Sequence, residues 1–216
     1  MRLVALSDTH GYHKKLTVPD GDILIYAGDF SMRARLSDVV LFANWLNSLP
    51  HEHKIIIPGN HDVYCEGDTD WARKEFSPAH YLLHSSVEVA GLRFFGSPYS
   101  SAIFEPSKWA FDYPPNGSQS KRLWSQIPTG TDILVTHGPP KNILDRVLYA
   151  DPGEDPNVGD HFLMWNVARI QPRLHIFGHI HEGYGSCLPE VGTHFYNVCV
   201  CDVEYKPVNP ITVIDL

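Results

Sequence analysis

Five short stretches of the chain are apolar at almost every position, and each ends abruptly in polar or glycine residues. Continuous apolar runs of this length, without alternation, are typical of β-strands that are covered on both faces. The five predicted strands comprise residues 3–6, 23–27, 55–57, 133–135 and 174–177.

Helical periodicity separates these strands in two places. One apolar stripe at the 3, 4 and 7 spacing predicts a helix that is capped by Ser37 or Asp38 and ends near Pro50. A second helix is predicted to begin at Asp160 and to end near Pro172. The inward residues are Val39, Phe42, Ala43, Leu46 and Leu49 in the first helix and Leu163, Val167 and Ile170 in the second.

Strands that alternate with helices indicate a largely parallel sheet and an α/β fold. The middle of the chain differs, because residues 81–83, 87–89 and 92–95 resemble shorter strands with little room for helices between them. Residues 195–200 and 211–214 add further β-structure near the end of the chain. Two sheets accommodate this pattern better than one simple sheet.

Composition narrows the class of protein. The chain has 216 residues, of which 43% are hydrophobic and 19% are charged, so we expect one globular domain over residues 1–216 rather than a disordered chain. Seventeen Lys and Arg residues against 25 Asp and Glu residues give a net charge of −8, which disfavours binding to a nucleic-acid backbone. The first apolar stretch is too short for a signal peptide or membrane span. We therefore expect a cytoplasmic protein without a membrane partner; the sequence leaves the oligomeric state open.

The four cysteines are too scattered to frame a disulfide scaffold. Cys199 and Cys201 lie two residues apart in a β-like run, so both point to the same face of a strand. A redox or zinc-binding pair is one interpretation. Small buried side chains in a reducing compartment are the favoured one, because no C-x-x-C partner occurs in the sequence.

Polar side chains with nitrogen or oxygen donors follow all five predicted strands. They are Asp8, His10, Asp29, Asn60, His61, His137, His179 and His181. Because the carboxyl ends of parallel strands meet at one edge of a sheet, we expect these eight side chains to lie together there. Asp22 and Asp132 precede their strands and are interpreted as turn residues at the opposite edge, whereas His175 lies inside a strand and is interpreted as structural.

Carboxylate and imidazole donors without thiolate are ligands for Mn, Fe, Zn or Ni in sites with open positions. Eight donors exceed the needs of one ion, and two ions that share a carboxylate use them well. Neither a glycine-rich phosphate loop nor a G-x-S-x-G nucleophile motif occurs in the sequence.

These residues, in this order, resemble the signature of the calcineurin-like metallophosphoesterases. The matching segments are Asp8-Thr-His10, Gly28-Asp29, Gly59-Asn-His-Asp62, His137 and Gly178-His-Ile-His181. Further segments at residues 136–140, 171–184 and 207–210 are similar to the metallophosphoesterase-domain phosphodiesterase subgroup. The resemblance implies an α/β fold of four layers, in which two mixed β-sheets are flanked by helices.

The resemblance also implies two divalent metal ions, with Mn²⁺ favoured and Fe, Zn, Ni or Co as alternatives. One ion would be held by Asp8, His10, Asp29 and His181, and the other by Asp29, Asn60, His137 and His179. The ions would activate a water molecule for in-line attack on phosphorus, with Asn60 also contacting the phosphate. His61 would face the phosphate and protonate the leaving alkoxide, and Asp62 would bias that imidazole toward its charged form.

The substrate class follows from resemblance alone. Phosphodiesters are favoured, with cyclic nucleotides or small aryl and nucleotide diesters as working substrates. Tyr99 and Trp109 are candidates for stacking on a base, although packing explains each equally well, and the loop over residues 97–117 is either a lid or a packed excursion. Arg33 is a weaker candidate for a phosphate contact. A phosphomonoesterase or protein phosphatase, and a non-catalytic scaffold on the same fold, are the alternatives.

Overall fold

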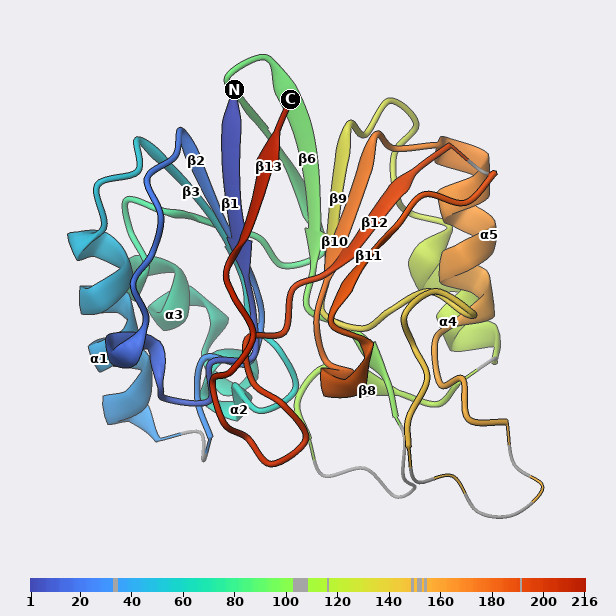
Figure 1. Ribbon diagram of the computed structural model, residues 1–216, viewed down its shortest axis with the longest axis horizontal. Helices are drawn as coiled ribbons and strands as arrows, with labels where there is room; N and C mark the ends of the chain where they lie inside the picture. The colour runs from blue at the N-terminus through green and yellow to red at the C-terminus, as the bar shows by residue number, and fades with distance from the viewer. Residues whose placement is uncertain are drawn as a thin grey trace.

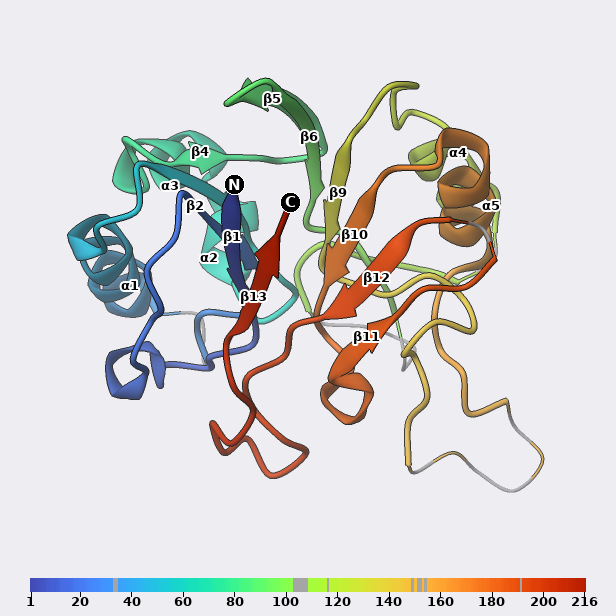
Figure 2. The same cartoon turned by 45° about the horizontal axis from the view of Figure 1, so that its top comes forward.

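The computed structural model of the chain describes residues 1–32, 35–102, 109–115, 117–148, 150, 153, 155–190 and 192–216. Two β-sheets face one another in the middle of the molecule, with helices on the outer side of each (Figure 1; Figure 2). The layers therefore run helix, sheet, sheet, helix, which is the predicted four-layered α/β arrangement.

The first sheet has the strand order β13-β1-β2-β3-β4. Its strands are β1 (Arg2–Leu6), β2 (Ile23–Ala27), β3 (His53–Ile57), β4 (His80–Tyr81) and β13 (Thr212–Asp215). Only β13 runs antiparallel to its neighbour. The outer side of the sheet is covered by α1 (Leu36–Ser48), α2 (Val63–Gly67) and α3 (Thr69–Glu75).

The second sheet has the strand order β11-β12-β10-β9-β6-β5. Its strands are β5 (Ser85–Val89), β6 (Leu92–Ser97), β9 (Ile133–Thr136), β10 (Leu174–Phe177), β11 (Gly185–Cys187) and β12 (His194–Asn197). Its outer side is covered by α4 (Ser118–Trp124) and α5 (His161–Ile170). A small sheet pairs β7 (Ser100–Ser101) with β8 (Asp112–Tyr113), and two 3₁₀ helices are η1 (His13–Lys15) and η2 (His181–Gly183).

Alternation along the strands builds three apolar layers. In β1, Val4 and Leu6 pack toward α1, whereas Leu3 and Ala5 pack toward the second sheet. The layer between the sheets contains residues from both, including Ile25 of β2. Both faces of the central strands are therefore buried, which is why their sequences are apolar without alternation.

The structure confirms the five apolar runs as β1, β2, β3, β9 and β10, and it corrects two details. Asp160 caps α5 as predicted, since its carboxylate accepts a hydrogen bond of 2.8 Å from the Leu163 N–H group. The first helix instead begins at Leu36, so neither Ser37 nor Asp38 is its cap. The late strand ends at Asn197 rather than at residue 200, because the chain then leaves the second sheet and pairs with the end of β1.

The prediction that the eight donors follow strands of one sheet was wrong. Strands β1, β2 and β3 belong to the first sheet, whereas β9 and β10 belong to the second. Their carboxyl ends nevertheless point to the same end of the molecule, at the bottom of Figure 1. Backbone hydrogen bonds from Ser7 to Val198 and from Val200 to Ser7 join the two sheets at that end. Within the described residues, no helix is long and apolar enough to cross a bilayer.

Candidate metal centre

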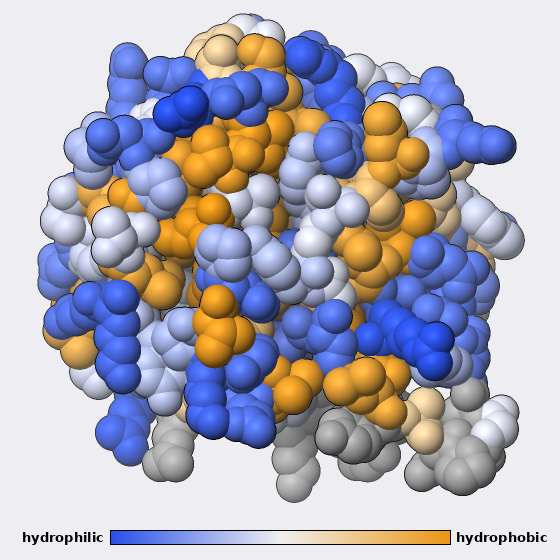
Figure 3. Space-filling model, viewed as in Figure 1, coloured by the Kyte–Doolittle hydropathy of each residue, from blue (hydrophilic) through white to orange (hydrophobic). Residues whose placement is uncertain are grey.

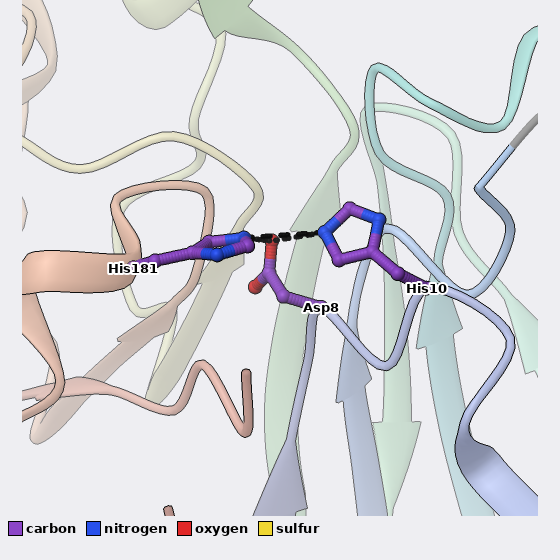
Figure 4. Close-up of side chains that lie close together, drawn as sticks. All are labelled: Asp8, His10 and His181. Carbon is purple, nitrogen blue, oxygen red and sulfur yellow. Dashed lines mark hydrogen bonds and ion pairs between the residues drawn. The ribbon is translucent and has the colours of Figure 1, made fainter. Parts of the chain in front are cut away.

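One group of donors gathers at the end of β1. Figure 4 shows Asp8 between the imidazoles of His10 and His181, although His181 comes from the far part of the chain after β10. The Nε2 atoms of His10 and His181 lie 3.9 and 3.6 Å from Asp8 Oδ1 and 3.1 Å from one another. Two imidazoles and one carboxylate thus converge on one point.

A second group gathers where β2, β3 and β9 end. The Nε2 atom of His137 lies 3.4 Å from Asp29 Oδ2 and 2.9 Å from Asn60 Oδ1. His179 Nδ1 lies 3.1 Å from the same Asn60 oxygen. Asp29 Oδ2 also lies 3.9 Å from His10 Nε2, so Asp29 stands between the two groups. The structure therefore brings together all seven side chains that the sequence proposed as metal ligands.

An unusual backbone conformation sets the direction of several donor side chains. Asp8, His10, Asp29 and His179 all have positive φ angles, of 53°, 42°, 59° and 69°. Non-glycine residues rarely adopt this left-handed region, and such strain clusters at functional sites. At these four residues the chain departs from the extended conformation of the strand that it has just left.

Two glycines of the sequence motifs leave room for the donors. A Cβ atom on Gly178 would lie 2.1 Å from Asp8 Oδ2, and a Cβ atom on Gly59 would lie 2.3 Å from Asp29 Oδ1. Each contact is far inside van der Waals distance. The two carboxylates therefore occupy space that any other residue would fill.

The orientation of three imidazoles is set by backbone carbonyl groups. His137 Nδ1 lies 2.9 Å from the Ala27 carbonyl oxygen, and His181 Nδ1 lies 2.7 Å from that of Asp202. His10 makes a longer contact of the same kind, 3.4 Å to the Ser31 carbonyl. A proton on Nδ1 would leave the Nε2 atom free for a metal ion, as is usual for histidines that bind metals.

Charge in the centre is strongly perturbed. Asp8 and Asp29 are almost completely buried. Burial by itself would raise the pKa of each carboxyl, but His181 and His137 hold the pKa of Asp8 below its ordinary value, and His137 does the same for Asp29. Burial lowers the pKa of the two imidazoles, yet Asp29 and Asp8 outweigh it and raise the pKa of His137 to about 10 and that of His181 to about 9. The negative charges of the buried Asp8 and Asp29 carboxylates are therefore stabilised by nearby positive charge.

Two other imidazoles are neutral. Burial lowers the pKa of His10 to about 4 and that of His179 to about 3. A neutral imidazole has a lone pair available for a metal ion, because no proton has to leave first. The Nε2 atom of His179 is buried and has no hydrogen-bond partner among the described residues.

The residues present fit divalent cations. Three sets of donors have ligand atoms that all lie within 4.8 Å of one another: Asp8, His10 and His181; His10, Asp29 and His61; and Asp8, Asp29 and His137. Carboxylate and imidazole donors, two buried carboxylates that are balanced only by protonated imidazoles, and a buried His179 nitrogen without a hydrogen-bond partner among the described residues are the features of a metal site.

His61 lies beside this centre. Its backbone N–H group donates a hydrogen bond of 2.8 Å to Asp29 Oδ1, and its Nδ1 lies 3.4 Å from the Met32 carbonyl oxygen. Its ring meets that of His10 edge to face, with 4.8 Å between the ring centroids.

Asp62 does not act on that imidazole in the way that the sequence suggested. Its Oδ2 atom accepts hydrogen bonds from the backbone N–H groups of Asp29 and Gly59, and its Oδ1 atom accepts one from Ser31. Burial and the Asp29 carboxylate raise the pKa of Asp62, and these N–H donors oppose that shift. Asp62 therefore fastens the loops after β2 and β3 to one another.

The aromatic candidates differ in position. Trp109 stacks on the His61 ring, with centroids 4.1 Å apart, and 48% of Trp109 is exposed. Tyr99 is partly buried and packs against His84 and Phe111 at the margin of the core. Arg33, residues 103–108 and residue 116 lie outside the described residues, so the prediction for the 97–117 loop is answered only in part.

Two further residues lie at the centre although the sequence did not connect them with it. The Cys199 thiol donates a hydrogen bond of 3.0 Å to Asp8 Oδ2, which agrees with a buried thiol and adds a contact with a donor carboxylate. Tyr205 lies against His10 and His181. By contrast, His175 was correctly interpreted as structural, since its Nε2 lies 2.8 Å from Thr136 Oγ1 inside the second sheet.

Comparison with known proteins defines the class. The sequence model of the family described as calcineurin-like phosphoesterase matches residues 1–183. The chain therefore belongs to this family of metal-dependent phosphoester hydrolases. Metallophosphoesterase domain-containing protein 1 of Homo sapiens is 40% identical over 239 residues, which cover 100% of this chain and 71% of that protein.

Solved structures show the same fold at low identity. The phosphopantetheinyl hydrolase of Mycobacterium tuberculosis matches with a TM-score of 0.64 and 16% identity, over 97% of this chain and 95% of that one. A structure described as a novel archaeal phosphodiesterase matches with a TM-score of 0.50 and 18% identity, over 100% of this chain and 93% of that one.

Proposed function

We propose that this chain hydrolyses phosphodiesters with the help of two divalent metal ions. The observation that carries the proposal is the position of Asp29, whose Oδ2 lies 3.9 Å from His10 Nε2 in one donor group and 3.4 Å from His137 Nε2 in the other. A shared carboxylate between two donor groups is the arrangement that two neighbouring ions require.

The two donor groups support the following assignment of ligands. Asp8, His10, Asp29 and His181 would hold one ion, and Asp29, Asn60, His137 and His179 would hold the other. Bound ions of this kind polarise phosphoryl oxygens and lower the pKa of water. The chain contributes the rest: it buries the carboxylates, fixes the imidazole tautomers and places His61 beside the centre. Nitrogen and oxygen donors without sulfur suit Mn²⁺ as well as Fe, Zn, Ni or Co, and we favour Mn²⁺ on the family resemblance.

His61 acts as the proton donor. Its Nδ1 faces the Met32 carbonyl and its ring is held between Trp109 and His10, so Nε2 is the atom that remains for the substrate. An alkoxide leaving group needs a proton, whereas a nitrophenolate leaves readily without one. A diester of an alcohol therefore depends on His61 more than an activated aryl ester does.

The test combines a substrate screen with one variant. Purified protein with added Mn²⁺ should hydrolyse bis(4-nitrophenyl) phosphate and at least one cyclic nucleotide, and chelation should abolish both activities. His61→Ala should retain both ions and lose about 10²- to 10⁴-fold in kcat on the cyclic nucleotide but far less on the nitrophenyl diester.

Other outcomes separate the alternatives. Activity on 4-nitrophenyl phosphate or phosphopeptides alone would show a phosphomonoesterase, and purified protein that binds no metal would support a scaffold. Loss of an ion from His61→Ala, measured by elemental analysis, would place His61 among the ligands. Equal losses on both leaving groups would assign it to positioning instead.

A further inference from the structure

The loop between β12 and β13 carries a tyrosine into the metal centre. This loop runs past the carboxyl ends of the strands at the bottom of Figure 1. The Tyr205 N–H group donates a hydrogen bond of 2.9 Å to the Asp202 carbonyl, which closes a turn. The Asp202 carboxylate accepts hydrogen bonds of 3.0 and 2.9 Å from the N–H groups of Glu204 and Lys206, which locks the turn from inside.

Two features show that this turn is built around the metal centre. The Asp202 carbonyl that closes the turn also faces His181 Nδ1 at 2.7 Å, so the turn and this imidazole are fixed together. Tyr205 has a φ angle of 58°, which is a costly conformation for a bulky side chain and persists only where the surroundings enforce it.

The Tyr205 ring lies against three histidines of the centre. Its centroid is 4.8 Å from that of His10 and 5.0 Å from that of His181, and both imidazoles meet it edge to face. The His61 ring lies 6.3 Å away. Yet 37% of Tyr205 is exposed, whereas only 4% of His10 is exposed, so the tyrosine lies where the centre meets solvent, a position that we call the entrance.

Exposed apolar side chains also occur on this loop. Val203 and Val208, on the same loop, are exposed to 42% and 61%, and hydrophobic groups lie among hydrophilic ones at the lower end of the face in Figure 3. Trp109 stacks on the His61 ring and is itself nearly half exposed. Two partly exposed aromatic rings therefore border the proton donor of the proposed reaction.

We propose that Tyr205 is a specificity-determining residue and that, with Trp109, it binds a flat aromatic ester group of the phosphodiester. This inference rests on the proposed function. A phosphorus atom held at the centre leaves its ester substituents at the entrance, where an aromatic ring would gain stacking contacts and an alkyl group would not. The substrate class is thus the aryl and nucleoside diesters rather than dialkyl diesters.

The test uses two substrates with one leaving group. Bis(4-nitrophenyl) phosphate and methyl 4-nitrophenyl phosphate both release nitrophenolate, so they differ only in the group that stays on phosphorus. We expect Tyr205→Leu to lower the ratio of kcat/KM for the aryl over the methyl diester by about 3- to 10-fold, through a higher KM for the aryl diester. Tyr205→Phe keeps the ring and should keep the ratio.

The matched control is Trp165→Leu, which removes an aromatic residue of α5 that is 63% exposed, and should leave the ratio unchanged. Metal content is measured for every variant. An unchanged ratio in Tyr205→Leu with both ions bound would overturn the inference. Equal losses on the two diesters would overturn it as well, because they would show that the ring only supports His10 and His181.

A binding measurement separates this inference from the proposed function. Phenylphosphonate and methylphosphonate are not hydrolysed, so calorimetry on the Mn²⁺-loaded protein reports the preference for an aryl group without turnover. Tyr205→Leu should reduce the phenyl preference and Tyr205→Phe should retain it. If the wild-type protein hydrolyses no diester but shows this pattern, the reaction class is wrong and the aromatic site stands. If diesters are hydrolysed without the pattern, the assignment of Tyr205 is wrong.

Discussion

Aspartates lie at the amino ends and at the carboxyl ends of the central strands, and their roles at the two ends differ. At the amino ends, Asp22 and Asp132 each accept a hydrogen bond from a backbone N–H group of a neighbouring strand, at 2.7 Å from Arg2 and 2.8 Å from Arg93. Both carboxylates reach solvent, Asp22 more than Asp132. The carboxylates of these aspartates each accept a backbone hydrogen bond at the edge of a sheet, and their charge is solvated.

At the carboxyl ends, Asp8 and Asp29 are buried and face imidazoles. Each also has a positive φ angle and lies where a motif glycine makes room for it. Buried charge is stable only when it is paired or bound to metal. The same residue type is therefore a turn residue at one end of a strand and a candidate ligand at the other, and the difference lies in burial and in what faces it.

The largest expected effect separates the two ends directly. Asp29→Asn removes the shared negative charge and should lose at least one ion together with nearly all turnover. Asp22→Asn should change neither. Metal content and kcat, measured for both variants, check the comparison, and near-normal values for Asp29→Asn would contradict two ions joined by Asp29.

Moving the Asp8 carboxylate without changing its chemistry should weaken metal binding almost as much. Gly178→Ala places a Cβ atom where Asp8 Oδ2 lies, so Asp8 has to move and one ion should bind much more weakly. Gly67→Ala, at the end of α2, is the matched control because nothing lies within 4 Å of its added Cβ. Titration of each chelated variant with Mn²⁺ measures the difference, and equal affinities would show that Asp8 contributes little to binding.

Chelated protein should show a pH dependence that comes from the carboxyl ends. The native pKa values of His137 and His181, about 10 and about 9, lie above the ordinary value of 6.5. Their protonation therefore stabilises the folded chain fully below about pH 6.5, and the stabilisation is lost as pH rises through 9 and 10.

We accordingly expect the chelated protein to stay folded at neutral pH and to lose several degrees of Tm between pH 6.5 and 10. Protein loaded with Mn²⁺ should lose less, because bound cations replace the protons. Circular dichroism melts with and without EDTA provide the measurement. A Tm of the chelated protein that rises over this range would contradict the assigned charges, and unfolding on chelation would make the ions structural.

The smallest effect belongs to the amino ends. Asp132→Ala removes the acceptor for the Arg93 N–H group and should cost about 1 kcal/mol of unfolding free energy, the usual net value of one hydrogen bond. Turnover and metal content should not change. Urea denaturation beside an activity assay tests this, and a loss of metal from Asp132→Ala would remove the distinction between the two ends.

Much of the site could be predicted from the sequence, because two local patterns encode it. Unbroken apolar runs identified the central strands, since both of their faces are buried. The polar residues that follow each run identified eight donors, since a strand's carboxyl end is a fixed position along the chain, and the family resemblance marked seven of them as candidate ligands. Asp160 was also readable as a helix cap, because a cap acts on an N–H group three residues away.

Only the tertiary structure decided how these pieces meet. It placed the five strands in two sheets, joined at one end through Ser7 and Val200, so that donors from both sheets face each other. It gave Asp62 a role in fastening loops and brought Tyr205 and Cys199 to the centre. These contacts join segments tens to nearly two hundred residues apart, and no periodicity or local spacing reports a contact of that kind. The sequence by itself determined which residues end the strands, and packing determined which of them touch.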